Sequence, residues 1–478
     1  MVETLAVTHK SHVSPTTEVE HPPRAAACQS TPMSAASLPG YPAPPSQIHS
    51  PTYTAAPQAH EYRLALNARL RPNRPPREFV KQTKNGGVSL RLVGQDDQAS
   101  LPVYGLGAFV QGTVDINKTE GITSVEVQIE GTLKLEEVAE GGAATHKLCL
   151  SKSILWVKDR TQDAPCPNSL RFNLTLPATF SDGDKTYPLP PSYEAHLSGL
   201  PGFRANINYS VSAFAVKPND VQNLVKSTLF RKDDWAVTTP FLYHPRTRPS
   251  VPIPTPLSAN PSLGGFDDTP QWKVFSSTVI PNRRGVQDVS VKLHLPATRI
   301  FCVRQPIPFH LSFHSTAESL AAFIAVAPVA GILSPKRQFT RIQLMRQTTV
   351  DVRNAMVLGT KTDIWRVDCI GEGAFRFSGD GADWAAFSGD IFIGDHITIG
   401  GFKAGGFSTR DYLVLNINPP DLLKSPFKEL RMVVPIRLAT DPWNEDGSGL
   451  GGYGGQYGPP SISSSEELEA APELHYQR

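Results

Sequence analysis

The chain is dominated by short segments in which apolar and polar residues alternate. In residues 169–176, the apolar residues Leu170, Phe172, Leu174 and Leu176 are separated by polar ones. A period of two places one set of side chains on a buried face and the other in solvent, which is typical of a half-buried β-strand. The same alternation recurs in residues 125–130, 206–212, 289–295, 412–418 and 432–438.

Turn signals separate these segments, and no long segment combines helical spacing with caps. The turn signals lie at residues 85–87, 141–142, 182–184 and 380–381, where Gly, Asn and Asp cluster. Many half-buried strands at short spacing predict antiparallel β-sandwiches. The predicted fold class is therefore all-β, with two tandem immunoglobulin-like sandwiches.

A proline-rich stretch divides the body of the chain. Residues 245–270 are rich in proline, which removes backbone donors and stiffens the chain, so this stretch is predicted to be a linker. The first predicted domain covers residues 61–244, with strands from about residue 86, and the second covers residues 271–440.

Both ends of the chain have the composition of tails. Residues 1–60 are rich in Pro, Ser, Thr and Ala without apolar periodicity, and residues 441–478 are first Gly-rich and then acidic. Such segments bury too little apolar surface to offset the entropy of ordering, so we predict two disordered tails. The C-terminal tail carries seven acidic residues against Arg478, which leaves the body basic although the whole chain has a net charge of only +2.

The composition of the chain argues against several classes of protein. The near balance of 46 basic and 44 acidic residues in 478 argues against a broadly basic nucleic-acid-binding protein. The five cysteines are widely spaced without a C-x-x-C pair, so neither a disulfide framework nor a zinc site is predicted. The N-terminus does not resemble a signal peptide, and the most apolar run, residues 320–333, is too short to span a bilayer. We expect a cytoplasmic protein without a cofactor.

Several strings resemble the fungal arrestin-like family of trafficking adaptors. The strings lie at residues 101–107, 110–114, 189–194, 207–213, 342–352, 400–405 and 433–438. The resemblance implies two sandwiches joined by a hinge in a non-enzymatic scaffold. Such a scaffold links membrane cargo, transporters or receptors, to a HECT-type ubiquitin ligase and to endocytosis. It would act peripherally at the plasma membrane or endosomes.

One motif fits the expected link to the ligase. Pro190, Pro191, Ser192 and Tyr193 form a Pro-Pro-x-Tyr sequence, which WW domains bind in the polyproline II conformation. The family also has a structural Pro-Pro-Ser-aromatic corner at this place. Two interpretations therefore stay open: a WW ligand, or a corner in which Tyr193 packs on the sandwich.

Further candidate contacts are charged or modifiable. Basic residues crowd the entry to the first domain and are candidates for binding cargo tails or anionic lipid; they are Arg63, Arg69, Arg71, Arg74, Arg77, Lys81, Lys84 and Arg91. Ser463, Ser464 and Ser465 precede acidic residues and are candidate phosphorylation sites.

The sequence is also compatible with two other classes of protein. One is a structural trafficking subunit of the retromer type, which shares the fold but assembles into a coat without a ligase. The other is a carbohydrate-active enzyme on a β-sandwich, which needs two carboxylates about 5–10 Å apart across a cleft. No sequence motif indicates such a pair.

Overall fold

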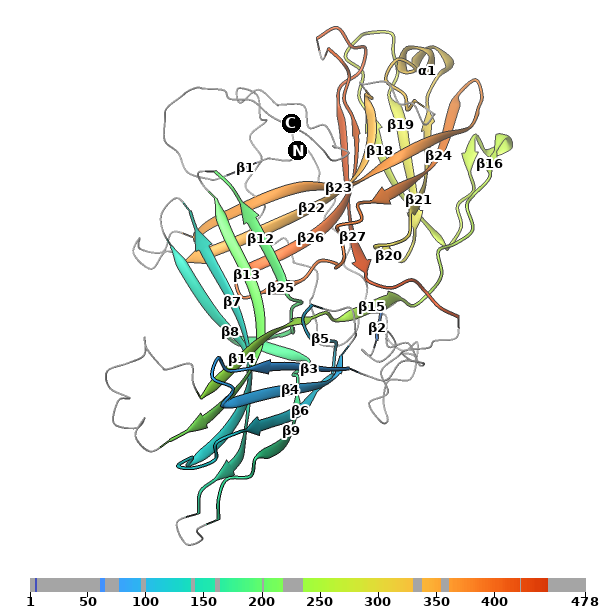
Figure 1. The fold of residues 1–478 in the computed structure, drawn as a ribbon. Coiled ribbons are helices and arrows are strands. Elements are labelled where there is room, and N and C mark those ends of the chain that lie inside the picture. Colours follow the sequence, from blue (N-terminus) through green and yellow to red (C-terminus); the bar gives the residue numbers. More distant parts are fainter. Residues whose placement is uncertain are drawn as a thin grey trace.

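The structure is a computed structural model, and it is all-β with two lobes (Figure 1). Its described part contains one α-helix, α1 (Ala317–Phe323), and one 3-10 helix, η3 (Pro261–Leu263). The structure describes residues 5–6, 61–64, 77–95, 100–138, 142–159, 164–199, 202–217, 235–329, 338–353, 361–421 and 423–445. Both predicted tails lie almost entirely outside these residues.

The first lobe is a sandwich of a four-stranded and a six-stranded sheet. The four-stranded sheet contains, in order, β3 (Arg77–Gln82), β4 (Val88–Gln95), β6 (Phe109–Ile116) and β9 (Ser169–Thr175). The six-stranded sheet contains β5 (Val103–Tyr104), β14 (Ala236–Tyr243), β13 (Phe203–Val216), β7 (Ser124–Glu137) and β8 (Ala143–Val157), with β12 (Tyr193–Leu197) beside β13. A hairpin of β10 (Thr179–Asp182) and β11 (Lys185–Pro188) completes the lobe.

The second lobe is built on one curled eleven-stranded sheet (Figure 1). Its order begins with β18 (Trp272–Val279), β19 (Val289–Pro296), β21 (Ile307–His314), β24 (Trp384–Ile393) and β23 (Lys361–Asp380). It continues with β22 (Thr340–Arg353), β26 (Phe407–Ile417), β27 (Leu430–Ala439) and β20 (Ile300–Cys302). Two short strands pair at its margins: β1 (Leu5–Ala6) with β23, and β25 (Lys403–Ala404) with β26.

The alternation in the sequence becomes the two faces of these strands, which confirms the predicted all-β class. In β9, Phe172 and Leu174 are buried, while the polar residues Arg171, Asn173 and Thr175 that alternate with them are exposed. In β7, Val125, Val127 and Ile129 are all fully buried. The alternation with a period of two therefore predicted correctly which of these side chains lie in the core.

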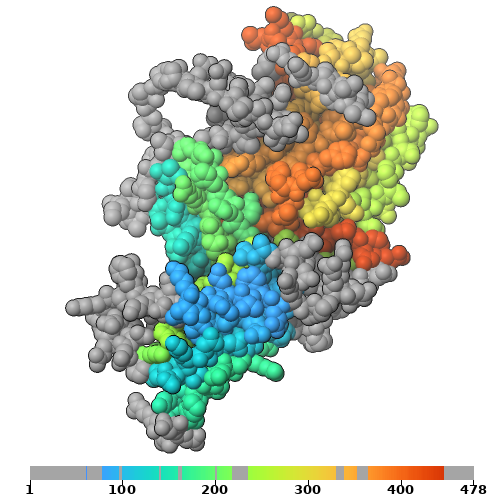
Figure 2. Space-filling model, in the orientation of Figure 1, coloured from blue at the N-terminus to red at the C-terminus, as the bar shows by residue number. Residues whose placement is uncertain are grey.

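The two lobes share apolar core. The strands β22, β23 and β26 extend from the second lobe over the first and form an arm across β7, β12 and β13 (Figure 1). Figure 2 shows the two lobes in contact where this arm meets the first lobe. The arm and the chain leading into β26 add buried residues to the core cluster of the first lobe, namely Val350, Ile364, Ile399, Phe402, Ala404 and Phe407.

The proline-rich segment is bonded to β2 (Glu61–Leu64) and to the second lobe. It begins with β15 (Arg246–Pro249), which pairs with β2, and continues through β16 (Ala259–Asn260), η3 and β17 (Gly265–Phe266). Phe266 packs on two buried histidines of the second lobe, His294 and His310, with ring centroids 5.7 and 4.6 Å away. The Leu257 N–H donates to His310 Nε2 at 3.0 Å, and Ser388 Oγ lies 2.8 Å from His310 Nδ1. The proline-rich segment therefore packs across the outer face of β19 and β21.

One cysteine differs from the expectation drawn from spacing. Cys149, Cys166 and Cys302 are free and buried, but Cys369 on β23 is disulfide-bonded. Wide spacing along the chain does not determine distance in the fold, so this bond could not be predicted from the spacing of the cysteines.

Candidate functional site

The Pro-Pro-x-Tyr motif forms a corner before β12. Pro190 and Pro191 are buried, and the Tyr209 hydroxyl donates a 2.6 Å hydrogen bond to the Pro190 carbonyl. The Ser192 N–H donates to the Tyr243 carbonyl at 2.9 Å, and Ser192 Oγ accepts from the Tyr243 N–H at the same distance. The corner is thus bonded to β13 and β14.

The last residue of the motif reaches the other lobe. The ring of Tyr193 meets Phe402 edge-on at 5.3 Å and Phe407 at 6.0 Å. Such aromatic pairs contribute about 0.5–1.5 kcal/mol beyond burial of area. Tyr193 also interacts with Arg346 on β22. The side chain that a WW domain would need lies at the junction between the lobes.

A buried ion pair lies beside this ring. Arg346 and Asp411 are only 4% and 3% exposed. The guanidinium binds both carboxylate oxygens, with Nε–Oδ1 at 2.7 Å and Nη2–Oδ2 at 3.1 Å, and Nη2 also donates to the Ile399 carbonyl at 2.8 Å. Burial by itself lowers the pKa of Arg346, but the Asp411 carboxylate and Tyr193 outweigh it, so the pKa is raised. This side chain stays charged.

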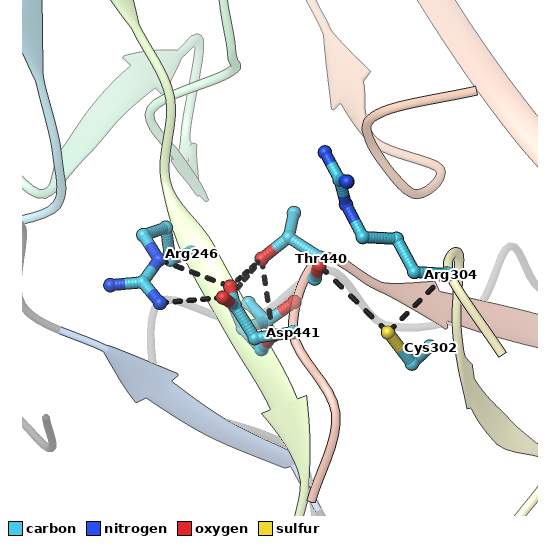
Figure 3. Close-up of polar contacts among 6 residues, drawn as sticks. Arg246, Cys302, Arg304, Thr440 and Asp441 are labelled. Carbon is cyan, nitrogen blue, oxygen red and sulfur yellow. Dashed lines mark hydrogen bonds and ion pairs between the residues drawn. The ribbon is translucent and has the colours of Figure 1, made fainter. Parts of the chain in front are cut away.

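A second ion pair joins β15, in the proline-rich segment, to the end of the second lobe (Figure 3). Arg246 on β15 binds Asp441 through Nε–Oδ2 at 3.1 Å and Nη2–Oδ1 at 2.5 Å. Thr440 Oγ1 accepts from the Thr247 N–H at 2.9 Å, and the Asp441 N–H donates to the Thr247 carbonyl at 3.0 Å. The Cys302 thiol lies against Thr440 from the other side (Figure 3).

A small cavity lies between these contacts. It measures about 100 Å³ and has walls from both lobes, including Pro190, Pro191 and Phe402. Its charged lining residues are Glu61, Arg246, Lys403 and Arg437, and Arg437 pairs with Glu61 at 2.9 Å. Ligand pockets typically measure about 300–1,000 Å³, so this space suits a few waters rather than a metabolite.

One buried cation next to this junction has two nitrogens without a hydrogen-bond partner among the described residues. Arg248 on β15 is 6% exposed, and its Nε and Nη1 atoms are buried without a hydrogen bond. Burial lowers its pKa, with Asp441 acting in the opposite direction and Arg246 in the same one. An unsatisfied buried donor costs about 1–3 kcal/mol.

Four of the basic candidates, Arg77, Lys81, Lys84 and Arg91, lie on the hairpin of β3 and β4. Lys81 and Lys84 are exposed on and beside β3, whereas Arg91 is engaged by Glu78 at 3.2 Å and Asp115 at 2.8 Å. Arg63 lies on β2 and Arg77 on β3. The remaining candidates lie outside the described residues, namely Arg69, Arg71, Arg74, Ser463, Ser464 and Ser465.

Sequence reasoning missed the buried pair, although the sequence contains a signal for it. Arg346 is in phase with the buried positions Ile342, Leu344 and Val350 of β22. Asp411 is likewise in phase with the buried positions of β26. A charge on the core face of a strand needs an opposite charge within reach, so two such positions of opposite sign predict each other.

No family model and no curated protein matches this chain. Among the described residues, no three His, Cys, Asp or Glu side chains are arranged to hold a metal ion. No helix in the described part is long and apolar enough to cross a bilayer.

Proposed function

We propose that this protein is a non-enzymatic adaptor scaffold of the arrestin-like type. It binds cytoplasmic segments of membrane proteins, transporters or receptors, and couples them to ubiquitylation and endocytic trafficking. It acts in the cytoplasm, peripherally at the plasma membrane or endosomes. The observation that carries this proposal is the junction, where two β-lobes are fastened into one two-lobed body.

Such a body suits an adaptor because an adaptor must hold two partners in a fixed relation. At the junction, the ring of Tyr193 from the first lobe packs on Phe402 of the second. The buried pair Arg346–Asp411 lies beside this ring within the second lobe, and the pair Arg246–Asp441 fixes the proline-rich segment to the second lobe. Arg366 on β23 adds a 2.7 Å bond to the His196 carbonyl of the first lobe. Surfaces on the two lobes are then presented together rather than independently.

We place the contact with a ligase outside Pro190–Tyr193. A WW groove binds an accessible polyproline II segment and takes up the tyrosine ring. Here the prolines are buried and the ring packs on Phe402 and Phe407. Recruitment would run through another segment or through a partner protein.

Affinity purification of the tagged full chain from its host, after reversible crosslinking, tests the proposal. We expect membrane transporters or receptors to be enriched over a tag-only control. The variant Lys81→Glu/Lys84→Glu should weaken capture of anionic partners, whereas Lys185→Glu/Lys273→Glu, which changes two exposed lysines elsewhere, should not. Absence of membrane proteins would overturn the proposal, and a stoichiometric coat complex would support the retromer-type alternative instead.

A further inference from the structure

The outer face of the second lobe carries two buried histidines beneath the proline-rich segment. His294 on β19 and His310 on β21 lie directly opposite each other in the sheet register, and both are almost fully buried. Their neighbours Leu293 and Leu311 belong to the core of the lobe. Successive residues of a strand point to opposite faces, so the two rings lie on the outer face, outside that core.

The layer that covers these rings is thin. Phe266 of the proline-rich segment packs on both of them, and the ring of Trp272 meets His310 at a centroid distance of 4.6 Å. The apolar cluster of this layer is small and separate from the cores of the two lobes; it consists of Phe266, Trp384 and Ala386, with Leu257 and Ala259 packed against them. A layer with so few buried apolar contacts opens locally more readily than a sandwich core does.

One hydrogen bond of this layer depends on the protonation state of His310. The Leu257 N–H donates to His310 Nε2 at 3.0 Å, so Nε2 must offer a lone pair. The neutral ring then carries its proton on Nδ1, which lies 2.8 Å from Ser388 Oγ. A second proton on Nε2 would point at the Leu257 N–H and set two donors against each other. The doubly protonated ring is therefore incompatible with the closed segment.

The charged groups around the two rings do not compensate for this conflict. On the strands next to His310, Arg376 of β23 and Asp390 of β24 bind each other at 2.6 Å. The other titratable groups that act on the cluster are Asp268 of the segment, Lys292 on β19, His314 on β21 and Asp383 before β24. Asp268 Oδ1 lies 3.7 Å from His294 Nε2, but its side chain is 78% exposed, so water weakens its attraction. Burial outweighs the carboxylates, and the pKa of each of the three histidines is lowered.

We propose that the proline-rich segment is an acid-released cover on the outer face of β19 and β21, and that protonation of His310 opens it. At neutral pH, the ring accepts the hydrogen bond from Leu257 and the segment stays closed. In acid, the ring takes up a second proton from solvent in the open form, where water solvates the charge. The outer face of β19 and β21 is then uncovered while both lobes stay folded. The inference does not depend on the proposed adaptor function.

Hydrogen–deuterium exchange of the full chain at pH 7 and pH 5 tests the cover. Exchange is expressed as protection factors, which removes the intrinsic effect of pH on amide exchange. A ring whose pKa is about 4 in the closed form and 6.5 in the open form makes opening about twentyfold more favourable at pH 5 than at pH 7. We expect the protection of Leu257, β16 and β17 to fall by about that factor and that of β19 and β21 to stay unchanged.

Two variants separate His310 from general effects of acid. His310→Gln keeps an acceptor for Leu257 and a donor for Ser388 but does not titrate, so we expect equal protection at both pH values. His396→Gln, which replaces an exposed histidine of the same lobe, should show the full fall. Equal protection at both pH values in the unmodified protein would overturn the proposal. A fall that persists in His310→Gln, or one that extends to β19 and β21, would overturn it as well.

A measurement on the unmodified protein tests the hydrogen-bond argument directly. Nitrogen-15 labelling of the histidines distinguishes the two neutral tautomers by NMR. We expect His310 to carry its proton on Nδ1 at pH 7 and to become doubly protonated over the same pH range in which β16 and β17 lose protection. A proton on Nε2 at pH 7, or protonation of His310 while the segment stays protected, would refute the proposal.

Discussion

The buried pair Arg346–Asp411 allows a sharp test of how the second lobe is stabilised. Replacing Asp411 with Asn keeps the shape of the side chain and leaves the Arg346 guanidinium charged and without a counter-ion. Both residues are almost fully buried and joined by two hydrogen bonds. Breaking such a pair by removing one partner costs about 3–5 kcal/mol. We expect a loss of that size in the free energy of unfolding.

A matched control is available in the same lobe. Arg376 and Asp390 form a pair of the same residue types at 2.6 Å, but the Arg376 side chain is 62% exposed. Exposed pairs contribute about 0–1 kcal/mol. Asp390→Asn is therefore expected to cost no more than about 1 kcal/mol, although the distance is as short.

The double variant Arg346→Met/Asp411→Leu tests the same account by removing the whole pair. It removes both charges and replaces them with apolar groups of similar size, which is often neutral or stabilising for a buried pair. Urea unfolding followed by tryptophan fluorescence and by circular dichroism measures all four proteins. The reasoning is refuted if Asp411→Asn costs no more than Asp390→Asn, or if the double variant is as unstable as the single one.

Three further predictions concern neighbouring features. Burial lowers the pKa of His310 to about 4, so the folded protein binds a proton at this side chain less readily than the unfolded chain does. The contribution of His310 to the free energy of unfolding is therefore full above pH 6.5 and is lost towards pH 4, by about 2 kcal/mol between pH 7 and pH 5. Urea unfolding measures this loss, and His310→Gln should make the free energy of unfolding less dependent on pH. Tyr193→Phe is expected to cost about 1 kcal/mol and Tyr193→Ala about 2 kcal/mol or more in the same assay, because only the second loses the ring packing on Phe402. Arg248→Leu should raise the thermal midpoint, since it removes a buried cation with unsatisfied donors worth about 1–3 kcal/mol; an unchanged or lower midpoint would contradict that account.

The sequence predicts local structure well and distant contacts poorly. Alternation identified β9 and the core face of β7 because period two is a property of neighbouring residues. The two interpretations of Pro190–Tyr193 could not be separated in the same way. The contacts that place the motif come from Tyr209, Tyr243 and Phe402, and nothing within the motif itself indicates them.

The junction shows the same limit. The arm of β22, β23 and β26 adds Val350, Ile364 and Phe407 to the core of the first lobe. These residues follow the proline-rich segment and belong to strands of the other sheet. The hydrophobic pattern predicts that these residues are buried, because it shows which face of a strand is apolar. It does not predict which other strand covers that face.

The shared core has a consequence for the order in which the protein is completed during synthesis. Domains generally fold as units as the chain emerges, the N-terminal one first. Here the first lobe still lacks part of its core until Val350, Ile364 and finally Phe407 have left the ribosome. The nascent first lobe must therefore carry an uncovered apolar surface while most of the second lobe is being made, and a chain stopped after residue 244 would keep that surface for good.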